Sequence, residues 1–142
     1  MKIYLFGTGK MGSLIARLAQ EDGEKVVTSL ERADVAIDFS HASLVEEHVD
    51  AAIAAQVPIV IGTTGWEDRL DQIRSKVKKS EIAALYAPNF SIGVARFLEL
   101  LKRSAELYPE FEISGEEIHH TEKKDAPSGT AKRIARELGM QN

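Results

Sequence analysis

The 142-residue sequence predicts an α/β fold, with a doubly wound parallel sheet covered by helices on both sides. Short apolar runs alternate with stretches whose apolar residues recur every three or four positions, which is the pattern of buried strands joined by amphipathic helices. Glycines or a Pro-Asn pair close several of these runs, as expected where strands end. The predicted strands are 3–6, 25–30, 35–39, 58–61 and 82–85.

Helices are predicted after most of these strands, with recognisable signals at some of their ends. Ser43 with Glu46 has the spacing of a capping box at the start of the second helix. Ser91 is placed to cap a long fourth helix, and Gly139 stands where the last helix should end. The predicted helices are 11–19, 44–52, 67–77, 94–105 and 131–138.

The alternation of strands and helices ends near Pro109, and a further strand is predicted at 111–118. The sequence therefore predicts one domain over 1–110 and the start of an α+β domain over 111–142.

Composition excludes several function classes. Apolar residues make up 44% of the chain and charged residues 28%, as in a soluble globular protein. The formal net charge of −4 gives no footprint for nucleic acid or an anionic membrane. Cysteine is absent, and no apolar run approaches the ~20 residues of a membrane helix. With no signal-peptide pattern, a cytoplasmic protein without nucleic-acid or membrane partners is expected.

A glycine-rich turn follows the first strand, with the spacing G-x-G-x-x-G over 7–12. In such a turn Gly7 allows the sharp bend, Gly9 lets a pyrophosphate approach the backbone, and Gly12 lets the helix pack closely. The helix start then offers N–H groups and a partial positive charge to the phosphates. The context predicts a Rossmann-type dinucleotide-binding domain; the alternative is a tight turn that binds nothing.

Further polar residues follow the other predicted strands. Glu31 has about the spacing of the acid that meets the ribose, and Arg32 beside it would suit a 2′-phosphate, so NADH and NADPH both remain open. A solvated loop is the alternative for both residues. The segments 62–65 and 87–91 end the fourth and fifth strands with small or amide-bearing residues that suit a nicotinamide.

The densest polar segment is 117–131, in which two histidines, two lysines and three acids lie within nine residues. Histidine can supply a proton near pH 7, and lysine can donate a proton or hold a carboxylate. A helix opening with hydroxyls and free N–H groups binds anions. The segment therefore suits reduction of a small dicarboxylate, with hydride from a cofactor and a proton from the protein. The alternative metal ligands would be Glu117, His119, His120 and Asp125, but adjacent histidines on an extended segment point to opposite sides, so no metal is expected.

This segment resembles the signature of the dihydrodipicolinate reductase family over the run Glu117-x-His119-His120-x-x-Lys123-x-Asp125-Ala126-Pro127-Ser128-Gly129-Thr130-Ala131. The segments 37–40, 62–65 and 87–91 are similar to further family blocks in the same order. The resemblance implies that His119 donates the proton and that Lys123 is a second catalytic residue. The implied substrate-binding residues are His120, Ser128, Gly129 and Thr130. The implied cofactor-binding residues are Gly7, Thr8, Gly9, Lys10, Met11, Gly12, Gly62, Thr63, Thr64, Ala87, Pro88, Asn89 and Phe90, to which spacing adds Glu31 and Arg32.

The resemblance also implies an activity. Members of this family reduce 4-hydroxy-tetrahydrodipicolinate, or dihydrodipicolinate, to tetrahydrodipicolinate with NADH or NADPH, in the diaminopimelate route to lysine. They are usually homotetramers without a metal, and they continue with further strands of the substrate domain. Two alternatives remain: an NAD(P)-binding module without catalysis, and an unrelated dehydrogenase on the same fold, against which the 117–131 run argues.

Overall fold

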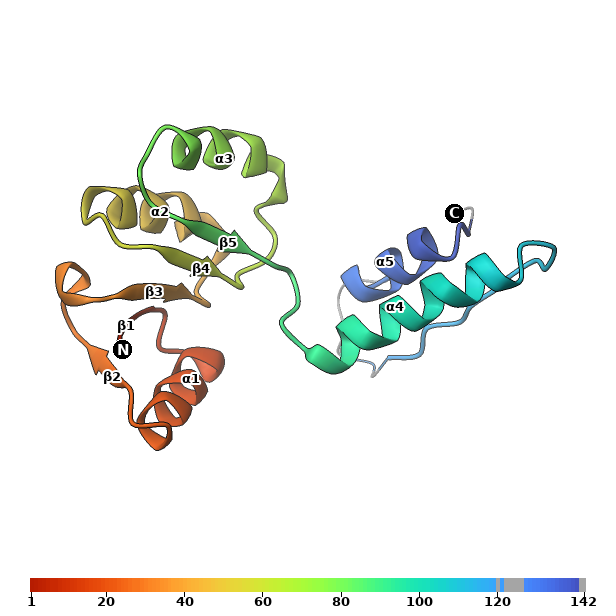
Figure 1. Cartoon of the computed structure of the whole chain (residues 1–142), viewed down its shortest axis with the longest axis horizontal. Coiled ribbons are helices and arrows are strands. Elements are labelled where there is room, and N and C mark those ends of the chain that lie inside the picture. The colour runs from red at the N-terminus through yellow and green to blue at the C-terminus, as the bar shows by residue number, and fades with distance from the viewer. Residues whose placement is uncertain (120, 122–126, 141–142) are drawn as a thin grey trace. The chain divides into compact units, whose positions relative to one another are not determined.

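The computed structural model describes residues 1–119, 121 and 127–140. The chain forms two compact units, Met1–Pro88 and Asn89–Asn142. The first unit carries a parallel sheet, and the second carries two helices (Figure 1). No helix in the described part of the chain is long and apolar enough to cross a membrane.

Five parallel strands form the sheet of the first unit, in the order β2-β1-β3-β4-β5. The chain moves from β1 to β2 on one side, returns past β1 to β3, and continues outward on the other side. This reversal creates a switch point between β1 and β3, where ligands bind in open α/β sheets. The predicted α/β parallel sheet is thus confirmed. The strands are β1 (Lys2–Phe6), β2 (Lys25–Val27), β3 (Val35–Asp38), β4 (Ile59–Ile61) and β5 (Ala84–Tyr86).

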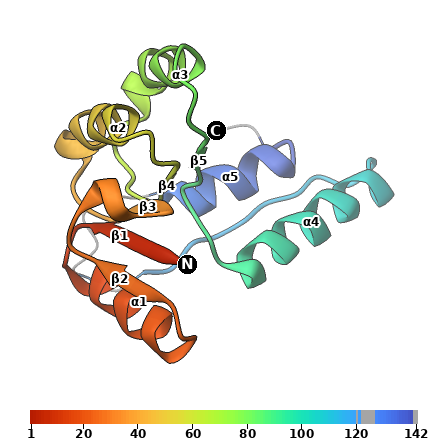
Figure 2. The same cartoon turned by 60° about the vertical axis from the view of Figure 1, so that its left-hand side comes forward.

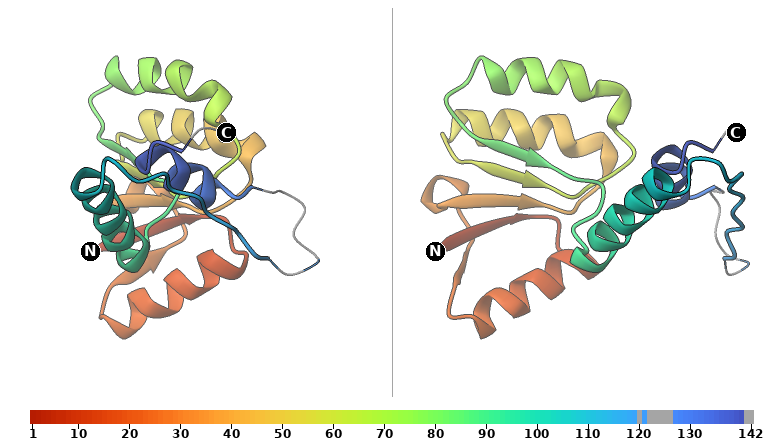
Figure 3. Two further views of the ribbon diagram at one scale, coloured as in Figure 1. Left: turned by 90° about the vertical axis from the view of Figure 1, so that its right-hand side faces the viewer. Right: turned by 45° about the vertical axis from the view of Figure 1, so that its right-hand side comes forward.

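Helices cover the two faces of this sheet unequally (Figure 3). One face carries α1 (Lys10–Glu21), whereas α2 (Val45–Ala54) and α3 (Leu70–Lys78) lie together on the other. Ile59 and Ile61 of β4 are only 1% and 2% exposed, within the core that α2 and α3 share with the sheet. The main core of this unit therefore lies on the face that two helices cover.

The buried face of α2 follows its helical spacing. Val45, Val49 and Ala52 recur at i, i+4 and i+7, and all three are fully buried. Trp66 and Ile73 close the same core from the segment leading into α3 and from α3 itself. Burial of each large apolar side chain contributes about 1.5–3 kcal/mol before the entropy cost of ordering the chain.

Two glycines are required by the packing at the end of β1. Gly7 has a φ of +94°, and a Cβ there would lie 2.7 Å from the carbonyl oxygen of Phe39. A Cβ on Gly12 would lie 2.0 Å from the carbonyl oxygen of Gly7, so only glycine lets α1 pack this closely on the turn. The predicted tight turn and close helix packing are confirmed.

The second unit contains α4 (Ile92–Leu107) and α5 (Gly129–Glu137), which pack against each other (Figure 2). The predicted cap at Ser91 is confirmed, because its hydroxyl accepts the Val94 N–H at 3.3 Å. Gly139 ends α5 with a φ of +67°, a backbone conformation that suits glycine at this position. The predicted domain boundary near residue 110 stays a prediction, while α4 itself belongs to this second compact unit.

The strand predicted at 111–118 is wrong. No described residue pairs with this segment in a ladder, and strand structure depends on hydrogen bonds to a neighbour. The predicted strand 25–30 stops at Val27, beyond which the chain enters a 3-10 turn at Leu30–Arg32 on its way back to β3. The fifth strand is shifted from 82–85 to 84–86.

The capping box predicted at the start of α2 is also wrong. Ser43 lies in a 3-10 turn, where its N–H donates to Nδ1 of His41, and α2 begins after it without a side-chain cap. Glu46 instead accepts a hydrogen bond from Lys76 of α3 at 2.7 Å. The carboxylate of Glu46 therefore joins two helices rather than closing one.

We predict that Gly12→Ala lowers the free energy of unfolding by about 1–3 kcal/mol, the usual cost of overpacking. Gly9→Ala is the matched control, since a Cβ there meets nothing within 4 Å and should cost less than about 1 kcal/mol. Urea unfolding of both variants checks the prediction, and equal losses would contradict it.

Candidate functional site

The amino end of α1 is arranged to receive an anion. Its N-cap, Gly9, makes no side-chain hydrogen bond, and the first turn carries no acidic residue. Thr8, Lys10 and Met11 are exposed around it. Because a Cβ on Gly9 would meet only open space, a diphosphate can reach the N–H groups at the positive end of the helix. The residues present at this turn fit a dinucleotide.

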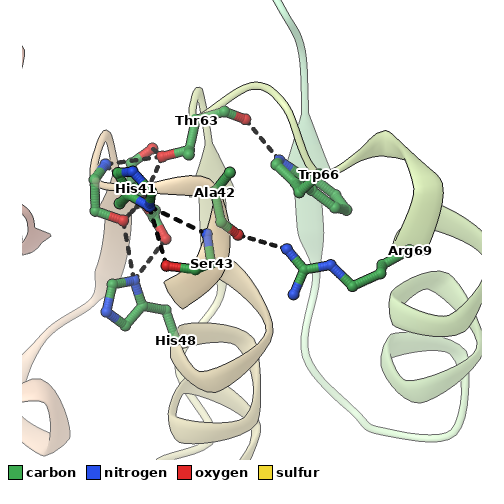
Figure 4. Close-up of polar contacts among 9 residues, drawn as sticks. His41, Ala42, Ser43, His48, Thr63, Trp66 and Arg69 are labelled. Atoms are coloured by element: carbon green, nitrogen blue, oxygen red, sulfur yellow. Dashed lines mark hydrogen bonds and ion pairs between the residues drawn. The ribbon is translucent and has the colours of Figure 1, made fainter.

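A buried carboxyl group lies at the end of β3, beside this turn. Asp38 is 0% exposed, and its Oδ1 accepts the Ser40 N–H at 2.9 Å and the Ser40 hydroxyl at 2.6 Å. The same oxygen accepts the Thr63 hydroxyl at 2.7 Å, while Oδ2 accepts Nδ1–H of His48 at 2.8 Å (Figure 4). We call these four residues the Asp38 network. The network ties together the ends of β3 and β4 and the middle of α2.

The Asp38 network also reaches β1. The ring of His48 stacks on Phe6 with centroids 4.1 Å apart and planes at 15°. Thr63, a predicted cofactor contact, is 6% exposed, and its hydroxyl donates a hydrogen bond to Asp38. Asp38, Ser40 and His48 are not among the site residues predicted from the sequence. The available signal was an acid at the end of an apolar strand, followed by a histidine among the apolar positions of the next helix.

Gly62 and Phe39 fit together at the ends of β4 and β3. A Cβ on Gly62 would lie 2.1 Å from the Phe39 ring, so the ring occupies the space that any other residue would need. The Gly62 N–H donates to the Asp38 carbonyl at 2.8 Å. The predicted cofactor residue Gly62 therefore has a packing role in this edge of the sheet.

The loop after β4 is held by side chains that are not among the predicted site residues. The indole N–H of Trp66 donates to the carbonyl of Thr63 at 2.6 Å. Glu67 accepts the Gly65 N–H at 2.9 Å and the Tyr86 hydroxyl at 2.6 Å. The Tyr86 hydroxyl lowers the pKa of Glu67, while burial and then Glu67 raise the pKa of Tyr86. These contacts fix the loop that carries Thr64, which is exposed.

Glu31 and Arg32 lie in the 3-10 turn between β2 and β3, and both are exposed. Glu31 accepts the Ser29 hydroxyl at 2.6 Å, and this bond lowers the pKa of Glu31. Their predicted contacts with the ribose or its phosphate stay predictions.

The last group of predicted cofactor residues spans the boundary between the units. Ala87 and Pro88 follow β5 in the first unit, and Asn89 and Phe90 begin the second. Asn89 accepts the Ser91 N–H at 2.7 Å and so shapes the entry into α4.

Three residues discussed from the sequence, Glu117, His119 and Ser128, lie together at the start of α5. Glu117 contacts Nε2 of His119 through Oε1 at 2.6 Å and accepts the Ser128 N–H through Oε2 at 2.9 Å. The Ser128 hydroxyl also donates to Oε1 of Glu117. These bonds, led by the Ser128 hydroxyl, lower the pKa of Glu117 to about 2.

Ser128 is the N-cap of α5, and its hydroxyl accepts the Ala131 N–H at 3.0 Å. Gly129 and Thr130 form the first turn, where N–H groups have no acceptor within the helix and can meet a carboxylate. A cavity of about 530 Å³ adjoins them, with Glu117 and Thr130 in its lining. This volume is in the range of small-molecule pockets.

Two of the predicted active-site residues, His120 and Lys123, lie outside the described residues. Across the part of the chain that the structure describes, no three histidine, aspartate or glutamate side chains gather as metal ligands.

We predict that Asp38→Asn lowers the free energy of unfolding by about 1–3 kcal/mol, because the amide group cannot accept from all the buried donors. Asp34→Asn is the matched control. Asp34 is exposed and, among the residues that the structure describes, its side chain accepts only from the Lys2 N–H at 2.6 Å, so the loss in Asp34→Asn should stay within about 0.5 kcal/mol. Urea unfolding distinguishes the two, and a harmless Asp38→Asn would refute the structural role of the network.

We also predict that the Ser128 amide resonance titrates with a midpoint near pH 2, following Glu117. The pKa of Glu117 is depressed from 4.5, so its stabilising contacts are complete above about pH 4.5 and are lost as the pH falls through 2. Ser128→Ala removes the leading cause, and the Glu117 midpoint, read from its own carboxyl resonance, should then rise. The Gly65 amide, which reports Glu67, should not change in this variant. An unshifted Glu117 midpoint in Ser128→Ala would contradict the assigned cause.

Comparison with protein families matches two successive models: dihydrodipicolinate reductase, N-terminus, over residues 22–90, and dihydrodipicolinate reductase, C-terminus, over residues 93–142. A solved structure, a dipicolinate-bound dihydrodipicolinate reductase from Paenisporosarcina sp. TG-14, is similar with a TM-score of 0.69 and 26% identity. The alignment covers 97% of this chain and 65% of that one.

Curated relatives show the same match. A 4-hydroxy-tetrahydrodipicolinate reductase from Christiangramia forsetii is 36% identical over 100% of this chain and 65% of its own length. The protein of the same name from Natronomonas pharaonis is 38% identical over 94% of this chain and 63% of its own length. The chain thus spans just under two thirds of these relatives. Because the two family models follow each other along the chain and the relatives align with nearly all of it, the chain belongs to the dihydrodipicolinate reductase family.

Proposed function

We propose that this chain carries the cofactor-binding and proton-donating parts of a 4-hydroxy-tetrahydrodipicolinate reductase that uses NADH or NADPH in the diaminopimelate route to lysine. The observation that carries the proposal is the placement of His119. Its imidazole contacts Glu117 beside the first turn of α5, within the region that the C-terminal family model matches. The proposed proton donor, His119, thus lies next to the N–H groups of the first turn of α5, which suit a carboxylate.

The first unit would bind the cofactor at the carboxyl ends of its strands. The diphosphate would meet the N–H groups at the start of α1, which the open space at Gly9 leaves accessible. The edge formed by Gly7, Gly62 and the Asp38 network holds this turn in place. When bound, NADH or NADPH supplies a hydride. Glu31 would accept from the ribose of NADH, whereas Arg32 would pair with the 2′-phosphate of NADPH.

The second unit would hold the substrate and balance the charge. Reduction of dihydrodipicolinate to tetrahydrodipicolinate adds one hydride and one proton, so one proton must accompany each hydride. We assign that proton to His119, with Lys123 as the second catalytic residue. Gly129 and Thr130 would bind one substrate carboxylate, and Ser128 and His120 would contact the substrate beside them. A homotetramer, as usual in the family, belongs to this proposal.

We predict that the chain oxidises NADH or NADPH when the fresh product of dihydrodipicolinate synthase is added. His119→Ala should lower turnover by about 10²–10⁴-fold, the usual cost of losing a general acid, with cofactor affinity retained. Gly9→Val is the reciprocal control, which should lose cofactor binding because its side chain fills the diphosphate approach. Nucleotide fluorescence measures binding separately from turnover.

Two outcomes would overturn parts of this proposal. Cofactor binding without any substrate-dependent oxidation would indicate a nucleotide-binding module without catalysis. Full turnover in His119→Ala would remove His119 from the proton step.

A further inference from the structure

We propose that Glu117 is a positioning residue that fixes the His119 imidazole and couples it to the first turn of α5. This inference rests on the proposed function, because it takes His119 as the proton donor. The juxtaposition that carries it is a single carboxylate in contact with both a predicted catalytic side chain and a predicted substrate-binding turn.

The first step is the spacing of the two residues. Glu117 and His119 are two positions apart in a segment without regular secondary structure, and the contact between them places both side chains on the same side of it. Oε1 of Glu117 and Nε2 of His119 lie 2.6 Å apart, and the two side chains are 26% and 32% exposed. A short contact of this kind, partly shielded from water, restricts both the rotation of the ring and the choice of its tautomer.

The second step is that Glu117 is itself held. Ser128 donates to it twice, through its N–H at 2.9 Å and through its hydroxyl. The Ser128 hydroxyl in turn accepts the Ala131 N–H at 3.0 Å, so the carboxylate is attached to the helix through its cap. The anion also lies at the positive end of α5. Glu117 is therefore a fixed acceptor, and it stays ionised at neutral pH.

The third step concerns the space left for substrate. Glu117 engages the cap residue Ser128, whereas Gly129 and Thr130 of the first turn remain exposed. The protein's own carboxylate and a substrate carboxylate would then share the helix start, each on different N–H groups.

The contact with Glu117 determines which ring nitrogen of His119 faces the substrate. With Nε2–H donated to Glu117, the proton passed to substrate comes from Nδ1, the other ring nitrogen. The distance from His119 to the substrate carboxylate is then set by the chain of contacts through Glu117 and Ser128. Loss of Glu117 should reduce the rate of proton transfer more than it reduces substrate binding, because Gly129 and Thr130 keep their N–H groups.

The test uses the full chain and four variants: Glu117→Ala, Glu117→Gln, Glu116→Ala and His119→Ala. Glu116 is the matched control, since it is the exposed neighbouring carboxylate and, among the described residues, it makes no hydrogen bond or ion pair with His119 or Ser128. Long-range ¹H–¹⁵N spectra of labelled histidine show which ring nitrogen of neutral His119 carries the proton. Steady-state assays with dihydrodipicolinate give kcat and KM, and urea unfolding checks that each variant is folded.

We expect His119 to be the Nε2–H tautomer in the parent chain, in Glu116→Ala and, through the amide oxygen, largely in Glu117→Gln. Glu117→Ala should show a mixture of tautomers. Its kcat should fall by about 10–100-fold, as when an orienting partner is removed, with KM changed little. Glu117→Gln should recover part of that kcat.

Failure of this inference is distinct from failure of the proposed function. An unchanged tautomer in Glu117→Ala overturns the positioning role, as does an unchanged kcat in Glu117→Ala while His119→Ala is inactive. A chain without turnover, or a fully active His119→Ala, overturns the proposed function instead. The tautomer measurement needs no turnover, so it still decides whether Glu117 orients the ring.

Discussion

The buried carboxyl group of Asp38 is the interaction on which the rest of the first unit depends. An acid with no exposure to water is costly unless it is hydrogen-bonded on all sides. Here the donors come from Ser40, Thr63 and His48, which belong to three separate segments of the chain. The carboxyl group thereby joins the ends of β3 and β4 to α2. The turn after β1 is packed against this same arrangement through Gly7.

Much of this fold could be predicted from local pattern. Short stretches of sequence are enough to predict the apolar runs, the helical spacing of α2 and the roles of Gly7 and Gly12. The Asp38 network could not be predicted in this way, since its partners are separated in the sequence and meet only once the sheet has formed. The same reason explains the capping box. Glu46 has the right spacing, but in the folded chain its carboxylate pairs with Lys76 of α3, a contact that no local rule includes.

In the candidate site, the family resemblance predicts roles for His119, Ser128, Gly129 and Thr130, whereas for Glu117 the sequence suggests only an alternative role as a metal ligand. Its contact with His119 is local, because the two residues are only two positions apart in the sequence. Its contact with Ser128 crosses a loop and depends on where α5 begins. The strand predicted at 111–118 is wrong for a related reason: apolar spacing can suggest a strand, but it cannot show whether a neighbouring strand is there to pair with it.

The position of β1 between β2 and β3 has a consequence for how the chain reaches its native state. β1 pairs Lys2 with Lys25 on one side and Ile3 with Val35 on the other, so neither partner is joined to it by a tight turn. Such non-local parallel pairing makes folding slow for a unit of this size. During synthesis the apolar β1 leaves the ribosome before β2 and β3, and its edge toward β3 stays unpaired until β3 follows. An inner strand of the finished sheet therefore keeps one edge unpaired, and open to aggregation, until β3 has been made.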